Sequence, residues 1–235
     1  MPDEDTYPAS STDPAIQRLE DLIQRSLPAL ARPGEDPPEY ARSAVEVTPG
    51  EAQGFFRAID AGLFVLERDA QCRPIGLRAG YYCYPLLYRP LNAVNEVILW
   101  REWLTHAAAV ASLHGDFHYP RYDIALDVDA FDVLVYSRLN QPLLAVEAKK
   151  TSKELDRMLA EINSLPKHTW ELKCNAPRLS NAAKKYRGLL ALRPEFFLAV
   201  APGISRAYAV HYPDDRAVQR AELMPIEGIA AATDP

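Results

Sequence analysis

The chain has 235 residues, with 26 lysines and arginines against 32 aspartates and glutamates, a formal charge of −6 and a hydrophobic fraction of 48%. That fraction excludes a fully disordered chain, and no apolar run approaches the about 20 residues that a membrane-spanning helix needs. Three cysteines without a Cys-x-x-Cys pair and an acidic N-terminus exclude a disulfide framework, a thiolate zinc site and a signal peptide, so we expect a cytoplasmic protein without a membrane partner.

Residues 1–45 have the composition of an acidic, proline-rich arm that is partly disordered. One helix is predicted inside this arm, from Pro14 to about Leu27, because Ile16, Leu19 and Ile23 recur at helical spacing. The arm is a candidate contact for a protein partner, since residues 1–51 carry eleven acids and only four arginines.

Residues 46–90 are predicted to form an α/β accessory segment. Thr48-Pro49-Gly50-Glu51 has the pattern of a helix start, and Leu63 to Leu66 that of a strand. The tyrosine-rich stretch from Gly80 to Tyr88 is predicted to be extended, with Pro85 placing it at a sheet edge.

Residues 91–235 are predicted to form the core domain, which opens with a helix from about Ala93 to Leu113. In this helix Glu96 shares the apolar face with Leu99, Trp103 and Val110. Glu102 falls on the opposite side, as an ordinary surface acid would.

Three strands are predicted next, followed by two helices and two more strands. The middle strand has Asp132 among apolar residues, and the third ends in Glu147-Ala148-Lys149. Their predicted ranges are Tyr122 to Asp127, Phe131 to Tyr136, Pro142 to Ala148, a helix capped by Thr151-Ser152 to about Asn163, a helix from Asn181 to Leu192, and strands Phe196 to Val200 and Arg206 to His211.

Basic residues gather in the second half of the chain. Residues 148–187 carry ten lysines and arginines against four acids, so the block could contact nucleic-acid phosphates or be an ordinary solvated helix face. The candidate nucleic-acid-binding residues are Lys150, Lys153, Lys167, Lys173, Lys184, Lys185 and Arg187. No lysine precedes Lys149, which suggests that a lysine is used there for chemistry that arginine cannot perform.

The order helix, strand, strand, strand, helix, with Asp132 on the middle strand and Glu147-Ala148-Lys149 ending the next, resembles the PD-(D/E)xK nuclease superfamily. The resemblance covers about residues 93–162. It implies an α+β fold of restriction-endonuclease-like type, in which a central mixed sheet is flanked by helices, here with an N-terminal extension. Glu96 stands where many members keep an extra active-site glutamate.

Residues two apart on a strand point the same way, so Glu147 and Lys149 should face one cleft, with Asp132 about 5 Å away on the neighbouring strand. Two carboxylates that close favour a bound cation, and Mg²⁺ prefers oxygen ligands, with Mn²⁺ as a substitute. Metal held by Asp132, Glu147 and the Ala148 carbonyl would serve phosphodiester hydrolysis, and Glu96 could bind a second metal ion or its water shell. Lys149 would orient or deprotonate water and offset phosphate charge.

The resemblance therefore predicts a metal-dependent nuclease acting on DNA rather than RNA, in prokaryotic defence or DNA repair. The absence of a Gln-x-x-x-Tyr motif on the next helix favours an endonuclease over an exonuclease. A homodimer is expected if both strands are cut. The alternative is a catalytically inactive nuclease-fold adaptor subunit of a larger nucleic-acid-processing complex.

Other interpretations of single residues stay open. Asp132 could be a strand-end acid paired with an arginine, and Glu147 with Lys149 a surface ion pair. Glu96 could be a first-turn acid favoured by the helix dipole, and a bulge could exchange Asp129 for Asp132. His106 with His114 and His118 is a weaker candidate metal site.

Overall fold

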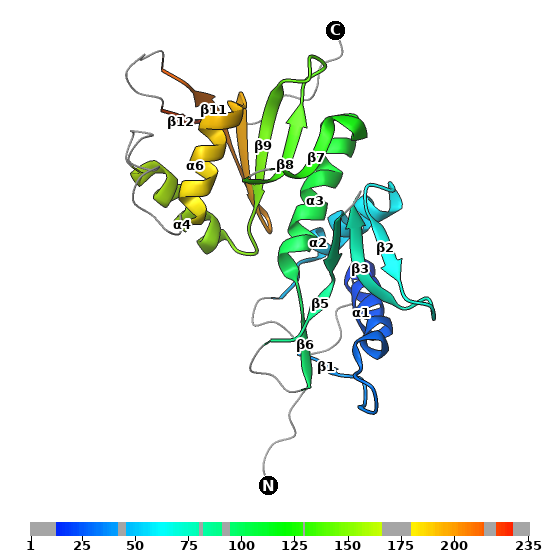
Figure 1. The fold of residues 1–235 in the computed structure, drawn as a ribbon. Coiled ribbons are helices and arrows are strands. Elements are labelled where there is room, and N and C mark those ends of the chain that lie inside the picture. Colours follow the sequence, from blue (N-terminus) through cyan, green and yellow to red (C-terminus); the bar gives the residue numbers. More distant parts are fainter. Residues whose placement is uncertain are drawn as a thin grey trace.

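The computed structural model describes most of the chain, in the ranges 13–41, 46–79, 82–90, 95–128, 130–165, 180–213 and 220–227. Within these ranges the protein is mixed α/β, with one six-stranded sheet and two three-stranded sheets (Figure 1). None of the helices described there is long and apolar enough to cross a membrane.

The helix predicted in the acidic segment is confirmed as α1 (Pro14–Ser26). Asp13 caps it, because its carboxylate accepts a hydrogen bond of 2.9 Å from the Ala15 backbone N–H. The apolar stripe of α1, which includes Leu19 and Ile23, is buried in the larger hydrophobic core. This part of the predicted arm is therefore folded onto the protein, while residues 1–12 and 42–45 lie outside the described ranges.

The second predicted helix start is also confirmed, as α2 (Pro49–Asp60). Thr48 and Glu51 form a capping box, in which each side chain accepts the other residue's backbone N–H. Phe55 and Phe56 are buried against the core. A short 3₁₀ turn, η1 (Leu27–Leu30), links α1 to the chain that leads to this helix.

Six short strands form two three-stranded sheets. One is antiparallel and contains β2 (Val65–Arg68), β3 (Pro74–Ala79) and β4 (Tyr82–Pro85), with β4 at its edge as Pro85 predicts. The other has β6 in its centre, and its strands are β1 (Glu39–Tyr40), β6 (Glu96–Leu99) and β5 (Leu87–Tyr88).

The helix predicted from Ala93 is wrong in its first part, because β6 occupies Glu96–Leu99 and the helix α3 begins only at Arg101 and ends at Gly115. Val97 and Ile98 are β-branched, which favours a strand, and β6 pairs with both β5 and β1. This tertiary pairing outweighs the helical spacing that extends upstream from α3.

The six-stranded sheet is formed by the second half of the chain. The three strands predicted around Asp132 and Glu147 are confirmed, two of them to the residue. Its strands in spatial order are β12 (Glu222–Ile226), β11 (Ile204–His211), β10 (Phe196–Ala201), β9 (Pro142–Ala148), β8 (Phe131–Tyr136) and β7 (Ile124–Val128), the last preceded by the 3₁₀ turn η2 (Arg121–Asp123). Only β9 and β10 run parallel.

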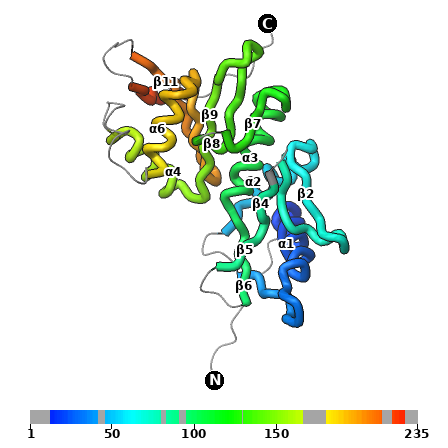
Figure 2. Tube along the Cα trace, viewed as in Figure 1, coloured from blue at the N-terminus to red at the C-terminus, as the bar shows by residue number. Residues whose placement is uncertain are grey.

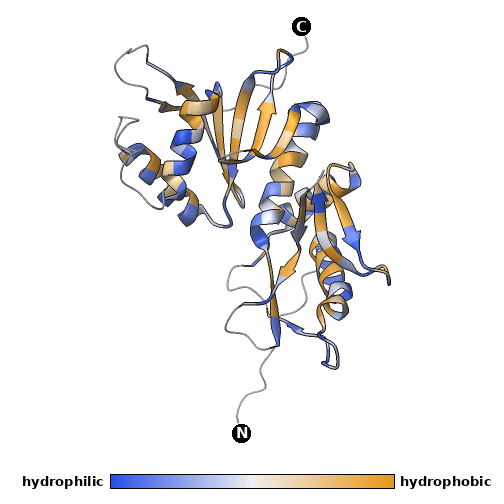
Figure 3. Ribbon diagram, viewed as in Figure 1, coloured by the Kyte–Doolittle hydropathy of each residue, from blue (hydrophilic) through white to orange (hydrophobic). Residues whose placement is uncertain are grey.

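Helices cover both faces of this sheet. Val133, Leu144 and Val146 belong to the larger core, on the side of α3, which also packs against α2 (Figures 1 and 2). Leu134 and Ala145 belong to a second core with α4 (Ser152–Ser164) and α6 (Asn181–Leu192). Figure 3 shows the hydrophobic strands between the more polar helices. Each fully buried leucine contributes about 1.5–3 kcal/mol, so these two cores hold the end of β9 in place.

Candidate functional site

Asp132 and Glu147 lie next to each other where the start of β8 meets the end of β9, just beyond the last residue pair of the two strands. Val133 pairs with Val146, so continuing the antiparallel register by one residue brings Asp132 opposite Glu147. The Asp132 side chain takes part in the contact there, because its Oδ2 accepts a hydrogen bond of 2.7 Å from the Ala148 backbone N–H. The predicted juxtaposition of the two acids is therefore present in the structure.

Glu147 is almost completely buried, with 1% of its side chain exposed. It follows Ala145 by two residues on β9 and so lies on the same face of the sheet, which α4 and α6 cover. Its Oε1 accepts a hydrogen bond of 2.6 Å from Lys149 Nζ. Its Oε2 lies 2.5 Å from Lys185 Nζ but has no hydrogen bond of acceptable geometry within the described residues.

Lys149 joins β9 to α3. Its Nζ donates to Glu147, to the Ala148 carbonyl at 2.9 Å and to Glu102 Oε1 at 3.3 Å. Its backbone N–H donates to the Val200 carbonyl at 2.8 Å, which fixes the lysine to the end of β10. The ammonium group therefore lies among oxygen atoms from two strands and one helix.

The protonation states of these groups are strongly perturbed. Burial raises the pKa of Glu147 to about 7, with a further contribution from Asp132, although the two lysines act to lower it. Burial acts to lower the pKa of Lys149, but Glu147, Asp132 and Glu102 outweigh it, so its pKa is raised. Lys149 is therefore held as a cation near neutral pH.

The helix acid in this cluster is Glu102 and not Glu96. Glu96 lies on β6, is exposed and pairs in register with Glu39 of β1, so the structure does not bring it to the other site residues. Glu102 lies in the first turn of α3, 3.3 Å from Lys149. Glu102 is a partly exposed acid, with 40% of its side chain exposed, but it contacts Lys149, which is distant in sequence, and helical spacing alone does not show that contact.

Lys185 is a second lysine of the site. It comes from α6, has 13% of its side chain exposed and lies beside Glu147, whereas the other described basic candidates on the helices are exposed. Helical spacing could have shown this burial: Lys185 lies between the buried Ala182 and Leu189 on the inner side of α6, whereas Lys184 is exposed.

The other basic candidates are spread over the surface. Lys150 is exposed and pairs with Glu154 at 3.3 Å, and Lys153, Lys184 and Arg187 are exposed on α4 and α6. Lys167 and Lys173 lie outside the described residues, as does Asp129.

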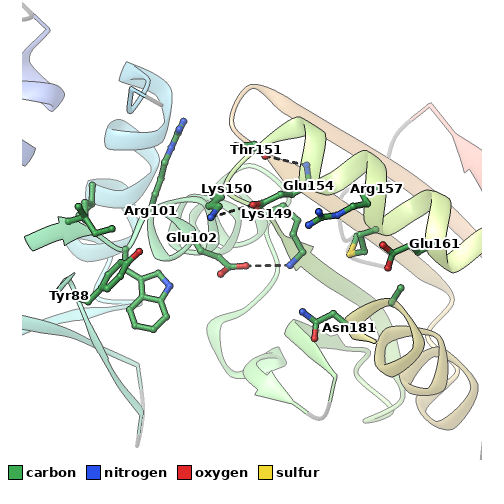
Figure 4. Close-up of a pocket in the computed structure, with 15 residues that line it drawn as sticks. Tyr88, Arg101, Glu102, Lys149, Lys150, Thr151, Glu154, Arg157, Glu161 and Asn181 are labelled. Atoms are coloured by element: carbon green, nitrogen blue, oxygen red, sulfur yellow. Dashed lines mark hydrogen bonds and ion pairs between the residues drawn. The ribbon is translucent and has the colours of Figure 1, made fainter. Parts of the chain in front are cut away.

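A cleft of about 620 Å³ opens beside Lys149 (Figure 4). One wall is formed by Lys150, just before α4, and by α4 itself with Arg157 and Glu161. The other is formed by the end of β6, the start of α3 and Tyr88. Glu102 lies between the two walls and contacts Lys149. The cleft gives a ligand a path to the ammonium group.

Behind the site, His106 of α3 is buried. Its ring stacks on Trp103 at 5.3 Å between centroids, and Trp103 stacks on Tyr84 at 3.7 Å, whose hydroxyl hydrogen-bonds Asp127. Burial lowers the pKa of His106, which therefore stays neutral. These contacts connect α3 through Tyr84 of β4 to Asp127 of β7.

A histidine metal site is not formed. His114 Nδ1 lies 2.9 Å from the Tyr119 carbonyl oxygen and so ties down the loop after α3. Across the part of the chain that the structure describes, no group of three or more His, Cys, Asp or Glu side chains is arranged to hold a metal ion.

The oxygen atoms at the end of β9 nevertheless suit a hard cation. Asp132 and Glu147 supply two carboxylates and Ala148 a carbonyl, all within reach of Lys149 or the Ala148 backbone. Both carboxylate oxygens of Glu147 lie beside cations, Oε1 at 2.6 Å from Lys149 and Oε2 at 2.5 Å from Lys185, so the two lysines favour the ionised carboxylate that a metal ion would need. This donor set is of the kind that Mg²⁺ prefers.

Comparison of the chain with family models, with curated proteins and with solved structures finds no match.

Proposed function

We propose that this protein is a metal-dependent nuclease that hydrolyses phosphodiester bonds, with DNA as its substrate. The observation that carries the proposal is the meeting of Asp132 with Glu147-Ala148-Lys149 at the adjoining ends of β8 and β9, where Asp132 accepts the Ala148 N–H at 2.7 Å. A solvated surface pair would not account for a glutamate that is 1% exposed beside two lysines.

The fold supports the same proposal. The order α3, β7, β8, β9, α4 and then β10 parallel to β9 agrees with the helix and strand order on which the resemblance to the PD-(D/E)xK superfamily rests. The site lies at the ends of β8 and β9, in a mixed sheet that helices cover on both faces, and this favours a restriction-endonuclease-like core. A cleft opening at the end of β9 gives this core access to substrate.

Each residue of the site has a role in this proposal. Asp132, Glu147 and the Ala148 carbonyl would hold Mg²⁺ or Mn²⁺, which would supply a Lewis acid and a more acidic bound water. Lys149 would contact the phosphate and stabilise the negative charge that develops on its oxygens. Because its pKa is raised, Lys149 serves as a cation and not as a general base.

Lys185 and Glu102 adjust the charge of the site. Lys185 neutralises Glu147 from the side of α6, and Glu102 holds Lys149 from the side of α3. When phosphate and metal ion are bound, these contacts limit the movement of the Lys149 side chain, which helps to place it for the reaction.

The test compares wild-type protein with Lys149→Ala on supercoiled plasmid, linear duplex, single-stranded DNA and RNA, with Mg²⁺, Mn²⁺ or EDTA. We expect metal-dependent cutting that Lys149→Ala loses. Arg32→Ala is the control, because Arg32 is also a cation, its side chain is 62% exposed and it does not line the cleft. Cutting by both variants alike, or none by a folded wild-type protein, would contradict the proposal and favour the adaptor alternative.

A further inference from the structure

Two exposed aromatic rings line the cleft on the wall opposite α4. Tyr88, the last residue of β5, is 38% exposed, and Trp100, between β6 and α3, is 37% exposed. Their ring centroids lie 5.1 Å apart with planes tilted by 56°. Large aromatic side chains are normally more buried than this, so an exposed pair inside a cleft indicates a ligand-contacting surface.

The aromatic pair is connected to the proposed catalytic residues through α3. Trp100 immediately precedes the first turn of this helix, and Glu102 of that turn lies 3.3 Å from Lys149 Nζ. Figure 4 shows Tyr88 on one side of the cleft, Lys149 and Arg157 on the other, and Glu102 between them. A strand whose phosphate contacts Lys149 therefore has these rings within reach of a neighbouring base.

The charges of the cleft indicate which kind of strand it binds. Lys149, Lys150 and Arg157 are offset there by the acids Glu102, Glu154 and Glu161. A fourth cation in the lining, Arg101, is buried and paired with Glu51. The protein as a whole carries −6. Attraction for phosphates alone, which provides most non-specific binding to duplex DNA, is correspondingly weak. Affinity must come from other contacts, and stacking on aromatic rings is available only to bases that are not paired inside a duplex.

The size of the cleft agrees with this. Its volume of about 620 Å³ lies within the roughly 300–1,000 Å³ of pockets for small ligands, which suits a nucleotide more than a double helix. We infer that Tyr88 and Trp100 form a stacking platform for an unpaired base, so that the substrate class is single-stranded DNA or a duplex with a single-stranded segment. This inference rests on the proposed nuclease function for its meaning, but its test measures binding alone.

The experiment measures the fluorescence anisotropy of labelled oligothymidine and of a blunt duplex, with the full chain in EDTA so that no cutting intervenes. We expect the wild type to prefer the single strand. Tyr88→Leu and Trp100→Leu should each weaken single-strand binding about tenfold, with little change for the duplex, because stacking of one base on an aromatic ring contributes roughly 1–3 kcal/mol. Tyr88→Phe and Trp100→Phe keep an aromatic ring and should retain most of the affinity.

Tyr122→Leu is the matched control, because Tyr122 is 88% exposed and lies on η2, outside this cleft. Circular dichroism would establish that each variant is folded. The inference is overturned if the leucine variants bind oligothymidine as the wild type does, if they lose duplex and single strand equally, or if the wild type shows no preference for the single strand.

The two proposals fail separately. If the protein cuts DNA in a metal-dependent way while the two leucine variants bind the single strand normally, only the stacking platform is rejected. Protein that binds single strands through these rings but never cuts would reject the nuclease alone.

Discussion

Two buried glutamates of this protein have opposite surroundings. Glu51 of α2 is 4% exposed and Glu147 of β9 is 1% exposed, and both contact cations. Glu51 accepts two hydrogen bonds from Arg101, of 2.9 Å and 2.6 Å, and one of 2.9 Å from the Thr48 backbone N–H. Both of its oxygens therefore have partners, and this ion pair joins α2 to α3.

Glu147 is crowded by comparison. Two ammonium groups lie within 2.6 Å, a second carboxylate raises its pKa, and its Oε2 has no hydrogen bond within the described residues. The Lys149 that it contacts also lines an open cleft. A buried acid with a single arginine partner is typical of structural stabilisation, whereas a buried acid that lies beside a second carboxylate and has a strongly perturbed pKa is typical of a functional site.

Replacing Glu147 and Glu51 by glutamine, one at a time, tests most directly whether the two glutamates have different roles. Glu147→Gln should lower metal-dependent cleavage at least about 1,000-fold, because a metal ligand contributes several kcal/mol to transition-state stabilisation. The fold should survive, since a glutamate with a pKa of about 7 is already partly protonated at neutral pH. Glu51→Gln should instead destabilise the protein by about 3–5 kcal/mol, because Arg101 is then a buried charge without its partner.

Cleavage rates and urea unfolding of both variants check this prediction. Equal loss of stability in the two variants would mean that Glu147 is a structural residue like Glu51.

Replacement of Lys185 should reduce cleavage less than replacement of Glu147. Lys185→Met should lower cleavage about 10- to 100-fold, because it removes a cation 2.5 Å from Glu147 while keeping the aliphatic chain. Lys184→Met, at the exposed neighbouring position, is the control and should cleave as the wild type does. If both variants lose activity together, the lysines of α6 act as general phosphate contacts.

Metal affinity should depend on pH. A metal ion binds the ionised carboxylate, and the pKa of Glu147 is about 7, so affinity should be lower below pH 7 and level above it. Between pH 8 and pH 6 the ionised fraction falls about tenfold, and the dissociation constant for Mg²⁺ should rise about tenfold. Titration calorimetry at the two pH values would measure it, and an equal affinity at both would contradict the role of Glu147.

The smallest effect is expected at the helix acid. Glu102→Gln should lower cleavage about tenfold, because it removes the contact that positions Lys149 from α3. Glu96→Gln should have no effect, since Glu96 is exposed on β6. Loss of cleavage in Glu96→Gln with normal cleavage in Glu102→Gln would favour the role that the sequence assigned to Glu96. It would contradict the role of Glu102 in positioning Lys149.

Much of the fold could be predicted from the sequence because its signals are local. The caps at Thr48 and Thr151 and the alternating strands around Asp132 and Glu147 are short-range patterns that the structure preserves. The pairing of Asp132 with Glu147 could be anticipated for the same reason, since neighbouring strands of fixed register define which residues are opposite.

The remaining features depend on contacts between distant segments. The strand at Glu96–Leu99 forms because β1 and β5 pair with it, and only then does the helix begin at Arg101 and place Glu102 beside Lys149. Lys185 reaches Glu147 through the packing of α6 on the sheet. The contact of Glu102 with Lys149 is not visible in any local pattern, and helical spacing shows only that Lys185 lies on the inner side of α6, not that it reaches Glu147.

The central claim is that Asp132 and Glu147 form a metal site at the end of β9, and direct titration with Mn²⁺ tests it. Electron paramagnetic resonance would measure the concentration of free Mn²⁺ as the ion is added to wild type, Asp132→Asn or Glu51→Gln at pH 8. Each protein would first be checked for folding. The account predicts saturable binding by the wild type that Asp132→Asn loses and folded Glu51→Gln retains. Binding that Asp132→Asn leaves unchanged, or no binding by the folded wild type, would contradict it.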